Sequence, residues 1–318
     1  MYIEAGVLPA MAVVLRTRGL RKTYGSVVAL SGLDLEVHQS EVFGFLGPNG
    51  AGKTTFTKCV TGFVRPDAGE VEIAGIDALR HPTQAAYHVG LVPDQYDFYS
   101  NLTGRQHLDF YGRLLGMGKD ARQERIAQIL ALVRMEERAD TRVKTYSHGM
   151  KQRICIAQAI LHKPKLIFFD EPTNGLDAQG AFELREMIKG LAHDGTTVFL
   201  NSHQLNEVEQ TCRRVAVLDR GVLKAVAEVQ DMRRRSGASQ GTVSIRVLNP
   251  SAKLADAATK ALGHKPSFRA DTLEFRGSDT EAAVVVASLV KAGGQVASVS
   301  STAATLEAAF LSMVEGGA

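Results

Sequence analysis

The 318-residue sequence predicts an α/β fold followed by a small α+β domain. Short apolar runs lie between amphipathic segments in the first two thirds of the chain, and the clearest are KLIFFD (165–170), TTVFLNS (196–202) and VAVLD (215–219). Wholly apolar runs of this length are typical of parallel strands buried on both faces. Strands that alternate with helices indicate a sheet covered by helices. A change of composition after the stretch 231–241 indicates the second domain.

The other elements of the first domain follow the same alternation. KTTFTKCVTG predicts a helix over 53–62 that closes at Gly62, and Thr103 is placed to N-cap a helix over 103–116. Apolar residues in the second of these helices recur at helical spacing, and a further segment repeats the pattern over 121–133. The remaining expected strands of this part cover 13–17, 33–37 and 41–46.

The stretch 231–241 is first basic and then rich in glycine and serine, which indicates a linker. Its run Arg233–Arg235 could contact phospholipid or nucleic acid, but a solvated helix end is the commoner origin of such a run. We therefore expect a main domain over 12–235, a linker over 236–241 and an accessory domain over 242–318. The accessory domain carries no motif with recognisable chemistry. Its expected strands are 242–248, 272–277 and 296–301, and its expected helices are 251–262, 280–292 and 305–314.

Composition restricts the class of protein. The formal net charge of +3 is too small to argue for a nucleic-acid partner on charge alone. The three cysteines, Cys59, Cys155 and Cys212, are too far apart in sequence to indicate a metal knuckle or a redox pair, so we expect reduced thiols in a core. No apolar run reaches the ~18 residues of a membrane span, and the first residues lack the basic start of a signal peptide. We expect a cytoplasmic chain in which residues 1–11, which end at a second methionine, form an N-terminal extension.

One segment matches the phosphate-binding pattern G-x-x-x-x-G-K-[ST], between a predicted strand and a predicted helix. Successive backbone N–H groups of such a loop surround phosphate oxygens, and the helix that follows adds its positive end. The lysine reaches the β- and γ-phosphates, and the threonine hydroxyl is a ligand for Mg²⁺. The residues that we expect to bind the nucleotide here are Gly47, Pro48, Asn49, Gly50, Ala51, Gly52, Lys53, Thr54 and Thr55.

Two adjacent carboxylates end the apolar run 165–170. Asp170 is placed to hold Mg²⁺ at the carboxyl end of a buried strand, together with Thr54. Glu171, one residue further, is placed to act as the general base that polarises an attacking water. Because five apolar residues precede the pair, a solvated turn is a poor explanation of it.

Several further motifs occur in a fixed order around this loop. Tyr24 precedes the loop in KTYGS, YSHGMKQR contains Ser147 and Gly149, NGLD contains Asp177, and NSHQ contains His203. With these motifs the segment 13–230 strongly resembles the ATP-binding-cassette (ABC) ATPases, whose signature is usually written LSGGQ. The resemblance implies a P-loop NTPase domain with a mixed sheet core, a helical signature subdomain and an antiparallel β subdomain.

The resemblance also implies roles for these residues. Tyr24 would stack on adenine, and His203 would contact the γ-phosphate. Ser147 can N-cap the helix that begins at Gln152, so that its hydroxyl and the amide of Gly149 form a second anion site. Two chains would then pair head to tail, each completing the ATP site of the other, with ATP and Mg²⁺ as cofactors.

Two positions depart from the family pattern. The second residue of the signature is His148 where the family usually has glycine. The position at which the family carries a glutamine that contacts Mg²⁺ and water follows Val92-Pro93, and here it is Asp94, with Gln95 next. A carboxylate oxygen can make the same contact, so we assign it to Asp94 and leave Gln95 as the alternative.

A finer resemblance connects the chain to exporters whose ATPase is separate from the permease. It rests on the YSHGMKQR form of the signature, the LTGRQHLDFYGRLLGM segment and the ending TLEAAFLSM. It implies an ATPase on the cytoplasmic face of the membrane that energises a separately encoded integral permease. One alternative is a permease-free ABC ATPase that acts on ribosomes or DNA, but such proteins usually carry two cassettes or a strongly basic insert. A regulatory binder with weak hydrolysis is disfavoured because Lys53, Asp170 and Glu171 are all present.

Overall fold

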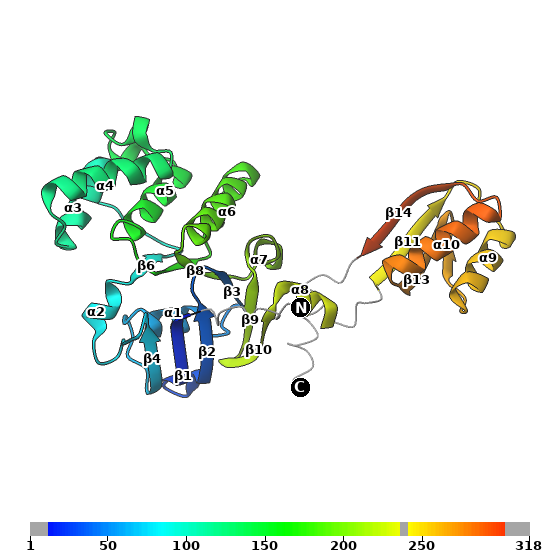
Figure 1. Ribbon diagram of the computed structural model, residues 1–318, viewed down its shortest axis with the longest axis horizontal. Helices are drawn as coiled ribbons and strands as arrows, with labels where there is room; N and C mark the ends of the chain where they lie inside the picture. Colours follow the sequence, from blue (N-terminus) through cyan, green and yellow to red (C-terminus); the bar gives the residue numbers. More distant parts are fainter. Residues whose placement is uncertain (1–11, 236–240, 303–318) are drawn as a thin grey trace, which may run out of the picture. The chain divides into compact units, whose positions relative to one another are not determined.

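The computed structural model describes residues 12–235 and 241–302, which form two compact units, Met1–Ala227 and Glu228–Ala318. Figure 1 shows the helices and strands of each unit. No helix within the described ranges combines the length and the apolar character needed to cross a membrane. The three cysteines are unpaired and buried.

The central sheet of the first unit has six strands in the order β10-β9-β3-β8-β7-β6. Each neighbouring pair in the row β9-β3-β8-β7-β6 is parallel, so the carboxyl ends of these strands lie along one edge of the sheet. Four of these strands were expected, over 41–46, 165–170, 196–202 and 215–219, and β6 was not, because four residues are too few to show a pattern. The bounds are β3 Val42–Leu46, β6 Val89–Val92, β7 Leu166–Asp170, β8 Thr197–Ser202, β9 Arg214–Asp219 and β10 Val222–Glu228.

Aromatic side chains pack the first helix, α1 (Lys53–Val60), onto this sheet. The Phe56 ring of α1 lies 4.9 Å from the Phe45 ring and 5.6 Å from the Phe199 ring, centroid to centroid. Phe168 extends the cluster from β7, and all of these rings are fully buried. Rings at these separations contribute packing energy beyond their buried area. The cluster therefore fixes the start of α1 at the end of β3.

A second, antiparallel sheet has the order β2-β1-β4-β5. Its strands are β1 Val13–Tyr24, β2 Val27–His38, β4 Ala68–Ile73 and β5 Ile76–Asp77. The first two are longer than the predicted 13–17 and 33–37. The outer part of β1 is rich in charged and polar residues, which hides its strand pattern, whereas β2 already begins at Val27, in an apolar stretch for which no strand was expected. The short helix α2 (Pro82–Ala86) leads from this sheet towards β6.

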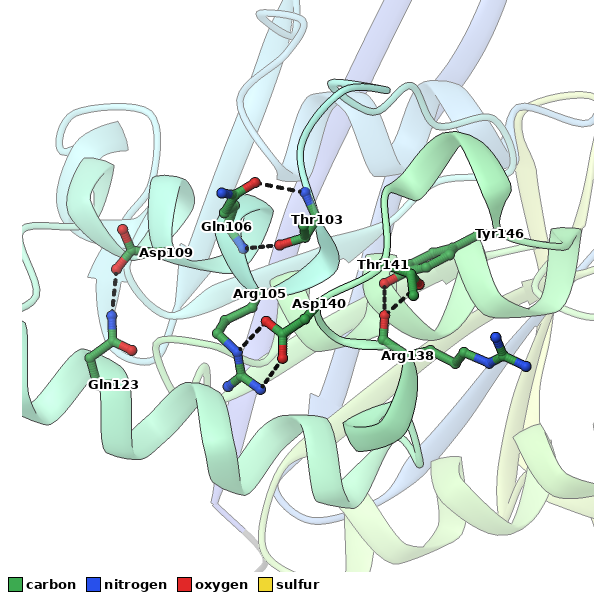
Figure 2. A network of polar contacts seen from close by, with 9 residues as sticks. All are labelled: Thr103, Arg105, Gln106, Asp109, Gln123, Arg138, Asp140, Thr141 and Tyr146. Atoms are coloured by element: carbon green, nitrogen blue, oxygen red, sulfur yellow. Dashed lines mark hydrogen bonds and ion pairs between the residues drawn. The ribbon is translucent and has the colours of Figure 1, made fainter.

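Helices α3 (Gly104–Leu114), α4 (Lys119–Leu132) and α5 (His148–Ala159) lie together in Figure 1, away from the antiparallel sheet. Figure 2 shows how the segment before α5 is held: both guanidinium contacts of Arg105 go to Asp140, at 2.9 and 3.1 Å. Tyr146 Oη donates to Arg138 O at 2.6 Å. Thr103 and Gln106 form a capping box at the start of α3, so the predicted N-cap is confirmed. The residue that precedes the signature is thus anchored within this helical group.

Two further helices complete the first unit. The first is α6, Ala178–His193, and the second is α7, Leu205–Thr211. Asp177 N-caps α6, since its Oδ1 accepts from Gly180 N at 2.8 Å. The 3₁₀ turns η1 (Glu136–Arg138) and η2 (Val143–Thr145) lie between α4 and α5.

The second unit contains a four-stranded antiparallel sheet in the order β12-β13-β11-β14. Helices α9 and α10 pack on one face, where Val243, Ile245, Leu254, Phe275 and Val285 form the core. The bounds are α8 Val229–Arg235, β11 Gly241–Val247, α9 Ala252–Leu262, β12 Ser267–Arg269, β13 Thr272–Gly277, α10 Asp279–Lys291 and β14 Val296–Thr302.

The predicted linker over 236–241 needs correction at its end, and the wider stretch 231–241 begins in a helix. Residues 231–235 belong to α8, because a run of arginines is compatible with helix, and Gly241 is already in β11. The segment 236–240 and the helix expected over 305–314 lie outside the described residues.

Candidate functional site

The parallel strands bring the predicted site residues to one edge of the central sheet. Asp170, the last residue of β7, lies opposite Asn201 of β8 in the strand register. The phosphate-binding loop follows β3, and His203 follows β8 directly. Asp94 follows β6, at the outer end of the same row of strands. This edge is where ligands bind in open α/β sheets.

The loop between β3 and α1 depends on glycine at two positions. Gly52 has φ +110°, and a Cβ there would lie 2.4 Å from Ala29 O. A Cβ at Gly47 would lie 2.4 Å from Leu218 O. Neither contact is possible for a real side chain, so the backbone itself forms the wall of the loop.

Lys53 begins α1, and its ammonium is turned back towards the loop. Its Nζ donates to Gly47 O at 2.6 Å and to Pro48 O at 3.3 Å. Burial lowers the pKa of Lys53, while the nearby Glu171 and Asp170 carboxylates act in the opposite direction. A buried cation whose hydrogen bonds go to main-chain carbonyl groups is a strong site for a phosphate anion.

A cavity of about 440 Å³ lies over this loop. The loop residues Pro48, Asn49, Gly50, Ala51, Gly52, Lys53, Thr54 and Thr55 line it, and so do Asp94, Asp170 and Glu171. The structure thus brings most of the residues predicted for the nucleotide and the metal into one cavity.

Other predicted residues lie outside the lining of this cavity. Tyr24 ends β1 and pairs with Val27, which does line the cavity. Tyr24 is 47 % exposed, and Lys22 Nζ lies 5.4 Å from the centroid of its ring. Gln95 is not among the lining residues, whereas Asp94 is. Of the two alternatives for this position, only Asp94 faces the cavity.

At the edge of the central sheet, the side chain of Asn201 contacts the Asp170 carboxylate. Asn201 Nδ2 donates to Thr57 Oγ1 at 2.7 Å and lies 3.4 Å from Asp170 Oδ1. Burial raises the pKa of Asp170, and the hydrogen bond from Asn201 opposes that shift. A bound cation would favour the charged form of this carboxyl.

Glu171 occupies a strained backbone conformation, with φ +50°. His203 Nδ1 lies 2.8 Å from Glu171 Oε2, although Oε2 has no aligned hydrogen-bond donor within the described part of the chain. Non-glycine residues in this region cost of order 1–3 kcal/mol and often occur at active sites. In this conformation Glu171 lines the cavity and its carboxylate lies beside the imidazole of His203.

The oxygen donors around the cavity fit Mg²⁺. Thr54 offers a hydroxyl, and Asp94 and Asp170 offer carboxylates, the ligands that Mg²⁺ prefers. Across the described ranges, no group of three or more His, Cys, Asp or Glu side chains is arranged to hold a metal by itself. Mg²⁺ commonly takes one or two carboxylates and completes its shell with water and substrate phosphates, so these donors suit it.

The signature residues lie on a different surface. Ser147 Oγ accepts from Met150 N at 3.3 Å, so Ser147 is the N-cap of α5. The helix begins at His148 and not at Gln152 as expected, because the cap fixes its first turn. Ser147 and Gly149 line a groove of about 900 Å³ beside α6, separate from the cavity over the loop.

Sequence reasoning missed some residues that the structure adds to the site. Val27, Val28, Ala29 and Arg220 also line the cavity. Arg220 directly follows the apolar strand β9, so its position at the strand's carboxyl end was a usable signal. Nothing in the pattern of Val27 to Ala29 distinguishes them from ordinary strand residues.

Comparisons with known proteins agree with this fold. The ABC transporter family model matches residues 30–174. Bacitracin transport ATP-binding protein BcrA of Bacillus licheniformis is 35 % identical over 71 % of this chain and 73 % of its own length. Bacillus subtilis (strain 168) YhcH, described as an uncharacterized ABC transporter ATP-binding protein, is 33 % identical over 95 % of this chain and 96 % of its own. A solved dimeric ATP-binding cassette in a post-hydrolysis state with ADP and phosphate is 25 % identical, with a TM-score of 0.61 over 67 % of this chain and 98 % of that one.

Proposed function

This chain belongs to the family of ABC transporter ATP-binding proteins, and we propose that it hydrolyses Mg-ATP to drive a membrane permease that is a separate polypeptide. The main support for the proposal is that Lys53, Asp170 and Glu171 line one cavity at the carboxyl ends of the strands. A buried cation, a metal-type carboxylate and a base-type carboxylate are the groups that phosphoryl transfer to water needs.

The chain's own groups divide the chemistry among them. The loop amides and Lys53 hold the triphosphate, while Thr54, Asp170 and Asp94 would hold Mg²⁺. Mg²⁺, when bound, neutralises charge on the β- and γ-phosphate oxygens. Water attacks the γ-phosphorus, the bond to the bridging oxygen breaks, and ADP and phosphate form. Glu171 takes the proton of the attacking water, and His203, 2.8 Å from Glu171, orients that carboxylate and contacts the γ-phosphate.

Two chains are needed for a complete site. The signature residues Ser147 and Gly149 lie on a groove of their own and not in the cavity that holds Lys53. In a head-to-tail homodimer, the signature of each chain would close the ATP site of the other. The likeness to a dimeric cassette supports this arrangement.

The likeness to BcrA supports a transport role, and we place the chain on the cytoplasmic face of the membrane beside its permease. Export is the direction favoured by the resemblance of the YSHGMKQR and LTGRQHLDFYGRLLGM segments to those of exporters. Tyr24 is assigned to the adenine, because its strand partner Val27 lines the cavity. No observation favours the alternative of a permease-free ATPase that acts on ribosomes or DNA.

Lys53→Ala tests the nucleotide assignment. Loss of the buried cation should weaken ATP binding by at least about 100-fold, since charge-assisted contacts to phosphate are among the strong ones. Lys58→Ala, an exposed lysine in the last turn of the same helix, is the matched control and should bind normally. Equal ATP affinity of the two variants in equilibrium binding would overturn the assignment.

The permease is tested by affinity purification from detergent-solubilised membranes. We expect an integral membrane protein to co-purify with the wild-type chain. Recovery of ribosomes or DNA in its place would favour the permease-free alternative.

A further inference from the structure

The first turns of α5 lie against the segment that follows Glu171. His148 Nε2 lies 3.2 Å from Asn174 O, and four residues later Gln152 Nε2 donates to Pro172 O. Residues four apart share one face of a helix, so both side chains reach the same strip of backbone. The signature helix is therefore attached to the catalytic segment by two side-chain contacts.

The imidazole of His148 fills the space between this segment and Tyr96. It lies 6.1 Å from the Tyr96 ring, centroid to centroid, with the ring planes 25° apart. A Cβ at Gly175 would lie 3.3 Å from His148 Nε2, so the ring packs directly against that glycine. A glycine at the second signature position, as in the usual family pattern, could make neither contact.

Asn174 continues the contact on its other side. Its Nδ2 donates to Asp94 Oδ1 at 3.3 Å, and its Oδ1 accepts from Gln204 Nε2 at 3.4 Å. Asp94 lines the cavity over the loop, and Gln204 follows His203. Asn174 thus contacts the signature helix through its main chain, and it contacts Asp94 and Gln204 through its side chain.

We propose that His148 and Asn174 are positioning residues that hold the signature turn in fixed register with Asp94 and His203 of the same chain. The proposal rests on the proposed ATPase function. In the head-to-tail dimer, the signature turn serves one ATP site while Asp94 and His203 serve the other. The His148–Asn174 and Asn174–Asp94 contacts would couple the position of the signature turn to that of the residues at the other half-site of the same chain. We therefore expect their loss to change turnover more than ATP binding.

The test is a double-mutant cycle on kcat and KM for Mg-ATP, with ATP affinity measured on the same preparations. We expect His148→Ala and Asn174→Ala each to lower kcat about tenfold, with KM within about threefold, the pattern of an interaction realised in the transition state. The double variant should be little worse than the poorer single variant, because residues in one network are not additive.

Two conservative variants separate positioning from general structural damage. His148→Gln keeps an amide donor for Asn174 O and should recover most of kcat. Asn174→Asp keeps the shape but loses the donor to Asp94 and places two carboxylates together, so it should be slower than Asn174→Ala. Gln128→Ala, which removes an exposed amide contact within α4, is the matched control and should behave as wild type.

The outcomes distinguish this inference from the proposed function. A wild-type chain that binds no ATP or hydrolyses none would contradict the function itself. With an active wild type, any of three results would overturn the positioning role alone. The kcat of both alanine variants could lie within twofold of wild type, or the losses of kcat could multiply in the double variant. The third such result is an Asn174→Asp chain as active as wild type.

Discussion

The two half-sites proposed for this chain are constructed in different ways. The phosphate loop is formed by backbone, with glycines that admit no Cβ and a lysine that is 7 % exposed. The signature turn is exposed and is held by side chains, with His148, Asn174 and Asp94 in contact at 3.2–3.3 Å. A backbone site tolerates little change, whereas a side-chain site can be re-made with different residues. We expect the binding energy to come mainly from the loop, and the rate to depend on Glu171, His203 and the side-chain contacts of the signature turn.

Glu171→Gln is expected to have the largest effect on turnover, because Glu171 lines the cavity over the phosphate loop and begins the segment that contacts α5. Loss of the base should lower kcat by about 10³-fold, within the range of general-base catalysis, while ATP still binds. Bound ATP without turnover should hold two chains together. Light scattering with and without Mg-ATP measures this, and a monomer under both conditions with ATP bound would contradict the shared site.

His203→Ala tests the same separation of ATP binding from turnover, and its expected effect is smaller. The phosphate loop should still bind ATP within a few-fold of wild type. The lost contact should reduce kcat by about 10²-fold, the magnitude typical of one transition-state donor. Steady-state hydrolysis beside equilibrium binding measures both quantities. Near-normal turnover would make His203 an ordinary structural residue.

Gly52→Ala tests the claim that the loop is a backbone site. Its Cβ would lie 2.4 Å from Ala29 O, so the loop must deform, and we expect ATP affinity to fall at least tenfold. Gly50→Ala is the matched control: φ is +82° there, but no atom lies within 4 Å of the added Cβ. The left-handed conformation alone costs roughly 1–2 kcal/mol. Equal ATP affinities of the two variants would show that strain, and not close approach, decides the position.

The smallest effect is expected from truncation after residue 235. Both regions lie within the first unit, and the residues assigned to ATP and Mg²⁺ all precede residue 227. We expect the truncated chain to keep its ATP affinity and kcat within a few-fold. Circular dichroism would show whether the truncated chain is folded. If it is folded and binds no ATP, residues after 235 belong to the nucleotide site.

The sequence predicted the phosphate loop better than its surroundings. KLIFFD and TTVFLNS identify β7 and β8 because strands buried on both faces are apolar throughout. The charged outer part of β1 and the four residues of β6 carry no such pattern, so their extent was missed. The motif from Gly47 to Thr54 specifies a backbone shape, which a sequence can encode locally.

The contacts of the signature turn could not be predicted in this way. His148 and Asn174 are 26 residues apart, and Asn174 and Asp94 are 80 apart. These contacts depend on how α5 lies against the segment after β7. The sequence indicated His148 only as a departure from the family pattern, and that departure leads to the contact described here.

The buried thiols give the chain a practical property. Burial raises the pKa of Cys59 to about 11 and that of Cys155 to about 12, and it raises the pKa of Cys212 as well. Because the thiolate is the reactive species, maleimide dyes should leave all three untouched in the folded protein. A single cysteine introduced on an exposed loop would then be labelled selectively without prior removal of native cysteines. Fluorescence transfer between two chains labelled in this way could follow their pairing during each turnover, in real time.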